Sequence, residues 1–164
     1  MDDEFLIHPD RLSEKPQVFK GTFSPGDLDR LEDSLASGEG ELHYTVTAGL
    51  DKLRRRVVSC IIEGFVFLTC QSSMDAFRFA ISVDDRLVLV GAESDLPSVG
   101  EESETEDYLV VEEALDIRDV VEDAVLLALP MVPRKPGHEQ SAMGGEVVRK
   151  ESPFAALASL KKDK

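Results

Sequence analysis

The stretch that decides the fold runs from Arg54 to Cys70 and reads RRRVVSCIIEGFVFLTC. From Val58 to Cys70, every second residue is apolar or small, and the residues between them are mixed. An alternation with a period of two is typical of a β-strand with one buried face. Gly64, inside this run, predicts a bulge or a bend. We therefore expect a long strand over 54–70 with one side facing the core.

The segments on either side of this run show the same period. Apolar and polar residues alternate over 42–48 and again over 76–83, and a short turn separates each segment from the central run. Residues 87–90 can add a fourth strand, and residues 108–111 a short edge strand. Three consecutive strands joined by short turns indicate an antiparallel β-meander, here of three to five strands.

A first helix is predicted over 25–37. Ser24 is suited to the N-cap, and Pro25 to the first helical position. Three leucines follow at helical spacing, and Gly38 ends the pattern.

A second helix is predicted to begin at Asp116 and to end before Pro130. Asp116 is its expected N-cap, and Asp119 lies in the first turn, where a negative charge is favourable. Its apolar stripe contains Ile117, Val120, Val121, Ala124, Val125 and Ala128, and is widened by Leu126, Leu127 and Leu129. Since such a stripe needs a partner, we expect this helix to pack on the open face of the sheet. The predicted fold class is α+β, an antiparallel meander packed with one or two helices.

The chain of 164 residues has the length of one domain with a tail. We expect a single α+β domain over 1–133, which starts with an extended arm of about 20 residues and contains a flexible acidic loop at 92–107. Residues 134–164 are expected to form a flexible tail with a short apolar helical segment at 153–161.

The charge of the chain limits its partners. It has 33 acidic against 18 basic residues, a net charge of −15. Residues 93–123 alone contain 13 acidic residues and one basic residue. This balance argues against a broad nucleic-acid surface and favours basic protein partners. No apolar segment is long enough to span a membrane, and the first four residues lack the positive charge of a signal peptide. We therefore expect a cytoplasmic protein without membrane contact.

No pattern in the sequence predicts catalysis or a cofactor. A phosphate-binding loop and a nucleophile elbow are both absent from the sequence. Cys60 and Cys70 are too few for a disulfide framework or a four-thiolate metal site. Cys70 is read mainly as a core residue, and the carboxylates of 101–113 as solvated loop charges. We predict no catalytic residue, no cofactor and no enzyme activity.

A basic cluster stands at the start of the central strand. Its members are Lys52, Arg54, Arg55 and Arg56. They are the candidate RNA contacts, although charged residues at a hairpin edge also discourage pairing between sheets. Both interpretations stay open.

Two further segments resemble the motifs of a known family. Residues 116–133, DIRDVVEDAVLLALPMVP, look like the signature of the YceD family, and residues 152–161, SPFAALASLK, resemble its closing motif. Members of this family are bacterial large ribosomal RNA subunit accumulation proteins. The strands between Leu42 and Val83 match more loosely.

One position departs from the family pattern. Many members carry C-x-x-C after the second strand and further Cys or His residues after the helix. Here Cys70 is followed by Ser73 at the second position, and Glu139 follows His138. Because two soft ligands do not complete a tetrahedral zinc site, we predict no metal and interpret Cys70 and His138 as remnants.

The resemblance implies a non-catalytic ribosome-biogenesis factor that is required for the synthesis, processing or accumulation of 23S rRNA. We expect it to act as an acidic adaptor or chaperone for ribosomal proteins or large-subunit assembly factors. The alternatives are direct RNA binding through Lys52 to Arg56 and a metal-dependent rRNA-processing nuclease, which we rank lower. The residues assigned to partner binding are Asp116, Asp119, Glu122, Asp123, Leu126, Leu129, Pro130, Pro133, Phe154, Leu157 and Leu160.

Overall fold

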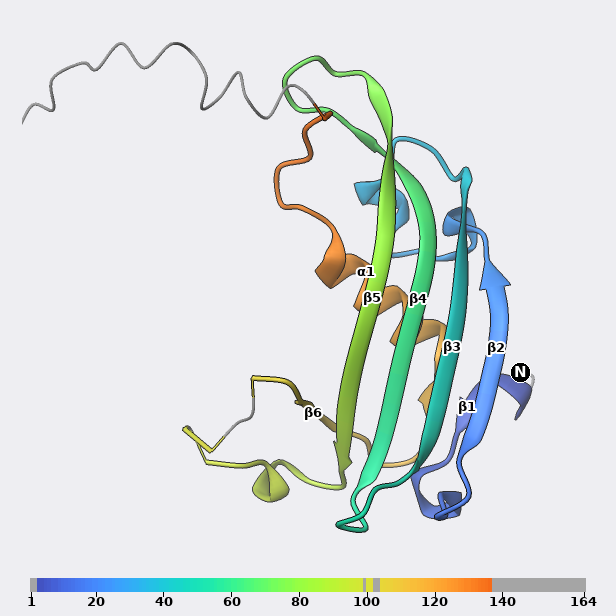
Figure 1. Ribbon diagram of the computed structural model, residues 1–164, viewed down its shortest axis with the longest axis vertical. Helices are drawn as coiled ribbons and strands as arrows, with labels where there is room; N and C mark the ends of the chain where they lie inside the picture. The colour runs from blue at the N-terminus through green and yellow to red at the C-terminus, as the bar shows by residue number, and fades with distance from the viewer. Residues whose placement is uncertain (1–2, 99, 102–103, 137–164) are drawn as a thin grey trace, which may run out of the picture. The chain divides into compact units, whose positions relative to one another are not determined.

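The computed structural model describes residues 3–98, 100–101 and 104–136. Residues up to Pro133 form one compact unit, which is described here by itself. Its centre is a five-stranded sheet with the strand order β2-β3-β4-β5-β6 (Figure 1). The strands are β2 (Gln17–Phe23), β3 (Gly40–Leu50), β4 (Arg56–Thr69), β5 (Ala76–Val90) and β6 (Asp107–Val110). Neighbouring strands from β2 to β5 are antiparallel, so the predicted α+β class with a meander is confirmed.

The sheet differs from the prediction at its ends. Residues 17–23, of which the first four belong to the expected extended arm of about 20 residues, pair with β3 as an additional strand. The two runs expected at 76–83 and 87–90 form one continuous strand. β6 is an edge strand, as predicted, but it runs parallel to β5. A parallel neighbour needs a long return connection, and residues 91–106 supply it.

The alternation in the central strand is confirmed. The side chains of Val58, Cys60, Ile62, Val66, Leu68 and Cys70 are all fully buried on the core side. The residues between them include Ile61, which is 44% exposed. The main core therefore lies on one face of the sheet, and the other face contributes the buried pair Val57 and Val88 near one end.

Gly64 does not mark a bulge. The pairing of β4 with β3 and with β5 continues through this residue without a shift in register. Instead, the glycine permits a close approach of the neighbouring strand, because a Cβ atom at residue 64 would lie 1.9 Å from the Glu41 carbonyl oxygen. Only a residue without a side chain fits at this position, which explains why it is a glycine.

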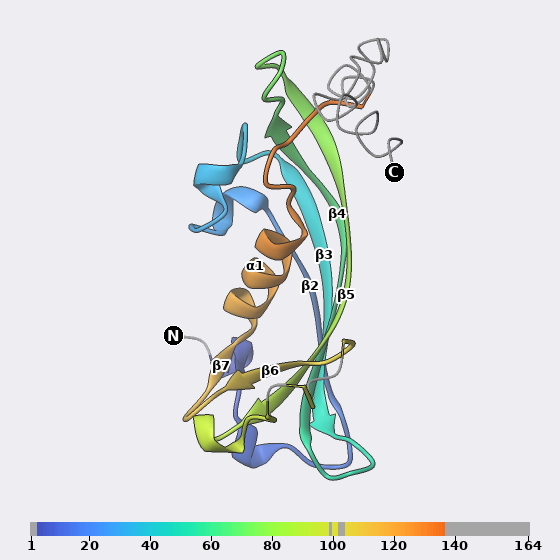
Figure 2. The ribbon, with the colours of Figure 1, turned by 90° about the vertical axis from the view of Figure 1, so that its left-hand side faces the viewer.

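Among the described residues, the one α-helix is α1 (Ile117–Ala128), which confirms the predicted second helix. Asp116 is its N-cap, since its carboxylate accepts a hydrogen bond of 2.8 Å from the Arg118 N–H. The buried residues on the helix include Ile117, Val120, Val121, Ala124 and Val125. As expected, the helix packs on the apolar face of the sheet, against β4 and β5 (Figure 2).

The prediction of a helix over 25–37 is wrong. Two short 3-10 helices, Pro25–Asp27 and Glu32–Ser34, take its place. Between them, the Arg30 N–H donates to Glu122 Oε1 at 2.6 Å, so it is not available for a helical hydrogen bond. Glu122 is only 4% exposed and also accepts from Arg30 Nε at 2.7 Å. A carboxylate from α1 therefore fixes this loop in a non-helical conformation.

The N-terminal segment and the start of α1 are joined by a second, two-stranded sheet. It pairs β1 (Leu6–Ile7) with β7 (Leu115–Asp116) in antiparallel orientation. Three more short 3-10 helices lie at Asp3–Phe5, Pro9–Arg11 and Glu93–Asp95. The helical segment expected at 153–161 lies outside the described residues.

No helix in the described part of the chain is both long enough and apolar enough to cross a membrane.

The close approach at Gly64 predicts a loss of stability when a side chain is added. Gly64→Ala should lower the free energy of unfolding by about 1–3 kcal/mol, because the backbone of β3 must move away from the new methyl group. Gly91→Ala is the matched control, since a Cβ atom there meets nothing within 4 Å. Urea denaturation of both variants measures the effect. Equal stability of the two variants would contradict the close packing at Gly64.

Candidate functional site

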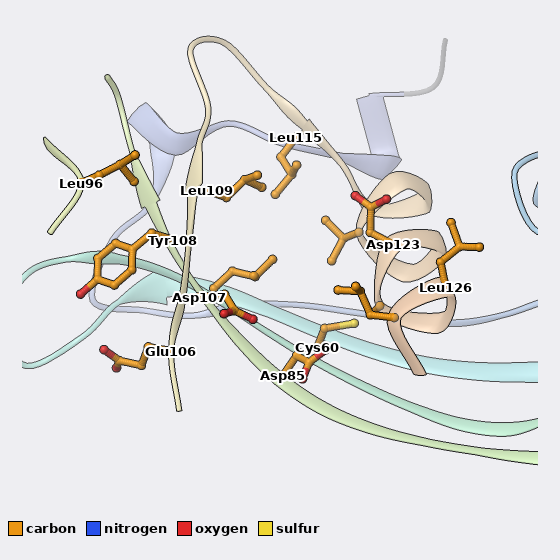
Figure 3. Close-up of a pocket in the computed structure, with 14 residues that line it drawn as sticks. Cys60, Asp85, Leu96, Glu106, Asp107, Tyr108, Leu109, Leu115, Asp123 and Leu126 are labelled. Atoms are coloured by element: carbon orange, nitrogen blue, oxygen red, sulfur yellow. The ribbon is translucent and has the colours of Figure 1, made fainter. Parts of the chain in front are cut away.

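A cavity of about 840 Å³ lies where the core-facing surface of the sheet extends beyond α1 (Figure 3). Its walls come from β4, β5, β6, α1 and the connection after β5. The lining residues are Cys60, Asp85, Leu87, Leu96, Glu106, Asp107, Tyr108, Leu109, Leu115, Val120, Asp123, Ala124, Leu126 and Leu127. The cavity thus combines leucine side chains with four carboxylates.

The position of Asp85 follows from the period of β5. Ile81 and Val83 face the core, and the same alternation brings Asp85 and Leu87 to that side. Asp85 is directly opposite Cys60 on β4 in the register of the sheet. A carboxylate therefore occupies a row that is otherwise apolar.

The electrostatic environment of Asp85 is unfavourable to its charge. Burial raises the pKa of the Asp85 carboxyl, and the neighbouring charges of Asp107 and Asp84 raise it further. Within the part of the chain that the structure describes, the Asp85 and Asp107 carboxylates have no hydrogen bond or ion pair. The cavity therefore presents two negative charges without a positive partner.

Cys60 is not suited to nucleophilic chemistry. Its side chain is fully buried, and burial, together with the charge of Asp85, raises the pKa of the thiol to about 12. Since the thiolate is the reactive form, the thiol stays protonated and unreactive at neutral pH.

The apolar part of the cavity includes residues that are exposed in the free molecule. Leu127 on α1 is 81% exposed, and Leu96 in the connection after β5 is 38% exposed. Leu126 is half-buried on the same helix. Two large apolar side chains at the cavity are therefore available to a ligand.

The other two acidic residues of the cavity do have basic partners. Glu106 accepts from Arg55 at 3.1 and 3.2 Å and from Arg86 Nε at 2.9 Å. The hydrogen bond from Arg55 has the largest effect on the pKa of the Glu106 carboxyl and lowers it. Burial raises this pKa, and the hydrogen bond from Arg86 lowers it further. Asp123 forms an ion pair of 2.6 Å with Arg30 Nη1.

The arginines that we proposed as RNA contacts all have acidic partners. Arg54 pairs with Glu14 at 2.9 Å, and Arg56 pairs with Asp10 at 3.2 Å. Arg55 joins Glu106 to Asp51, whose carboxylate lies 2.8 Å from its guanidinium. Lys52 is exposed in the hairpin between β3 and β4. The four residues lie at one hairpin, but three of them are partly neutralised within the molecule.

The residues expected to bind a partner on α1 have different environments. Asp119 is exposed, whereas Asp116 caps the helix and Glu122 is buried against Arg30. Asp123 and Leu126 line the cavity.

The segment after α1 contributes three of the expected partner-binding residues. Leu129, Pro130 and Pro133 are half-buried, and the Pro133 carbonyl accepts from the Gln71 N–H at 2.9 Å. Phe154, Leu157 and Leu160 lie outside the described residues.

The two residues interpreted as metal-site remnants are not seen together. Cys70 is buried at the end of β4, where its N–H donates to the Asp75 carbonyl at 2.8 Å. His138 lies outside the described residues. Among those residues, no group of three or more His, Cys, Asp or Glu side chains is placed to hold a metal ion.

The cavity itself was not predicted from the sequence. Asp85, Asp107 and Tyr108 were not among its candidate residues, although all three line the cavity. One signal was present: the period of the strand at 76–83 continues through Asp85 and Leu87. A charged residue at a core-facing position of a strand indicates a functional site or a buried partner.

Comparison with known proteins places this architecture in a context. The sequence model of the family described as "Large ribosomal RNA subunit accumulation protein YceD" matches residues 58–161. A protein of the same name from Haemophilus influenzae is 25% identical over 167 residues, which cover 94% of this chain and 94% of the relative. No solved structure matches the chain. The family match includes β4, β5, β6 and α1, which supply the walls of the cavity.

The environment of Asp85 predicts a gain in stability when its charge is removed. Because its folded-state pKa is raised, the charged carboxylate destabilises the folded state at neutral pH. Asp85→Asn should therefore raise the free energy of unfolding at pH 7 by about 0.5–2 kcal/mol. The gain should shrink as the pH falls through the folded-state pKa and should vanish below the unfolded-state pKa, where the carboxyl is neutral in both states. Asp84→Asn, on the exposed face of the same strand, is the control. A loss of stability in Asp85→Asn would show that the carboxylate has a favourable partner.

Proposed function

Because the chain belongs to the YceD family of large ribosomal RNA subunit accumulation proteins, we propose that it supports the accumulation of large-subunit rRNA as a non-catalytic adaptor. Its partners in this proposal are basic ribosomal proteins or assembly factors of the large subunit. The protein would hold such a partner through negative charge and apolar contact, and so influence rRNA through the proteins that bind it.

The observation that carries this proposal is the uneven compensation of charge. Arg54, Arg55 and Arg56 each contact a carboxylate of the same chain. By contrast, Asp85 and Asp107 face a cavity without a cation among the described residues. Free negative charge attracts basic proteins and repels RNA phosphates.

The region around the cavity adds to this negative charge. Residues 93–123 contain 13 acidic residues and one basic residue. That basic residue, Arg118, lies on the first turn of α1. A basic ribosomal protein has uncompensated positive charge until it binds rRNA. An acidic chaperone would shield this charge before the protein reaches the rRNA.

Direct RNA binding through Lys52 to Arg56 is the alternative proposal. It requires the arginines to exchange a carboxylate for a phosphate. Arg54 and Glu14 are both largely exposed, and such a surface pair contributes at most about 1 kcal/mol, so this exchange is inexpensive. Arg55, between Asp51 and Glu106, is held by two carboxylates that are largely shielded from solvent. The two proposals therefore differ in whether the positive hairpin or the acidic cavity makes the contact.

A binding experiment with the immobilised full chain separates these proposals. The chain is exposed in parallel to the mixed proteins of purified large ribosomal subunits and to protein-free large-subunit rRNA. We expect retention of basic ribosomal proteins that weakens from low salt to ~0.15 M salt, and little retention of rRNA. Reversing two charges in Arg54→Glu/Arg56→Glu should leave the retention of proteins unchanged.

The opposite pattern would contradict the adaptor. Retention of protein-free rRNA with a steep salt dependence, lost in Arg54→Glu/Arg56→Glu, would favour direct RNA binding. Cleavage of the rRNA on addition of Mg²⁺ would favour the nuclease. Retention of neither rRNA nor ribosomal proteins would remove support for both binding modes.

A further inference from the structure

We infer that the cavity between α1, β6 and the end of β5 is a docking site for a short segment of a partner protein, in which a large apolar side chain is flanked by lysine or arginine. This inference rests on the proposed function and deepens it, because it assigns the contact to one site and specifies the chemistry of the partner. It does not involve the hairpin at Lys52 to Arg56.

The cavity is large enough and apolar enough to take up a side chain of a partner. A volume of about 840 Å³ lies in the range of sites that bind small molecules and peptide anchors. Leu109, Leu115 and Leu126 line it together with the exposed Leu96 and Leu127. Covering the two exposed leucines with an apolar side chain would remove apolar surface from water, which favours binding.

The charge of the cavity selects a cation. Asp85 projects from β5 and Asp107 begins β6, and both carboxylates belong to the same cavity (Figure 3). The charge of Asp107 increases the electrostatic cost of the Asp85 charge, and no basic group among the described residues relieves it. A lysine or arginine placed between them would form charge-assisted hydrogen bonds to the partly buried Asp85 and the exposed Asp107, and such hydrogen bonds are stronger than neutral ones.

The same charges disfavour other occupants. A second copy of this chain carries a net charge of −15 and would bring further carboxylates toward Asp85 and Asp107. A purely apolar or an acidic ligand would cover the partly buried Asp85 and the exposed Asp107 without giving either charge a partner, which costs free energy. A cationic segment with an apolar anchor is thus the occupant that satisfies both halves of the cavity.

The test uses the full chain and fluorescein-labelled peptides of defined composition. The probe is a peptide of alternating lysine and leucine, and its binding is followed by fluorescence anisotropy at ~0.15 M salt. Two matched peptides replace every lysine by glutamine or every leucine by serine. We expect the lysine–leucine peptide to bind at least about tenfold more tightly than either matched peptide.

Variants of the chain locate the contact. Asp85→Asn should weaken binding of the lysine–leucine peptide about tenfold, although we expect this variant to be more stable. Asp84→Asn changes the net charge by the same amount on the opposite face of β5 and should leave binding unchanged. Leu127→Ser should also weaken binding, and since this side chain is 81% exposed, the variant should fold normally. Thermal denaturation checks the fold of each variant.

Three results would overturn the inference. Equal weakening by Asp84→Asn and Asp85→Asn would show attraction to the overall charge rather than to the cavity. Equal binding of the glutamine–leucine peptide would show that the cavity selects apolar ligands alone. Sedimentation of the chain as a dimer that Leu127→Ser dissociates would show that a second copy fills the cavity.

The outcome is separable from that of the proposed function. If the chain retains ribosomal proteins and Asp85→Asn retains them equally well, the docking site is wrong and the adaptor stands. If the lysine–leucine peptide binds at the cavity but ribosomal proteins are not retained, the docking site stands and the adaptor is wrong.

Discussion

The arrangement of this protein depends on a mismatch between the length of its sheet and the length of α1, the one α-helix in the described part of the chain. α1 has 12 residues and is therefore about 18 Å long, whereas β5 has 15 residues and extends over about 50 Å. The apolar face of the strands cannot be covered by this helix alone. In Figure 2, α1 lies near the middle of the strands, and other segments cover the regions beyond both of its ends.

The parts of the sheet that α1 leaves uncovered are treated in two ways. The loop that contains Arg30 covers one part, and the buried Glu122 of α1 holds this loop with two hydrogen bonds. Alongside Val120 to Leu127 of α1, β6 and the connection after β5 border a cavity instead of filling it. There the core-facing row of β5 continues through Asp85, whose charge is tolerable because the cavity is open. One carboxylate is thus satisfied inside the molecule, and the other is left to a ligand.

The structural features that depend on local patterns can be predicted from the sequence. The period of two over 54–70 identified the central strand and its buried face, and Asp116 marked the beginning of α1. The helix expected over 25–37 is wrong because a carboxylate distant in sequence, Glu122, takes the N–H of Arg30. Glu14 and Glu106, which pair with Arg54 and Arg55, could not be predicted because they lie far from these arginines along the chain, whereas Asp51, the other partner of Arg55, is four residues away. Asp85 was not predicted as a site residue, because the predicted strand ended at residue 83, two residues before it.

In our proposal, the free negative charge of this protein acts at one place, the cavity beside α1. The most direct measurement is a two-dimensional ¹H–¹⁵N NMR titration of the full chain with the lysine–leucine peptide. We expect the largest changes in amide chemical shift at cavity residues such as Asp85, Asp107 and Leu127. The chemical shifts of the hairpin at Lys52 to Arg56 and of the open face of the sheet should change little. Small changes spread over acidic residues on all surfaces, with none concentrated at the cavity, would contradict it.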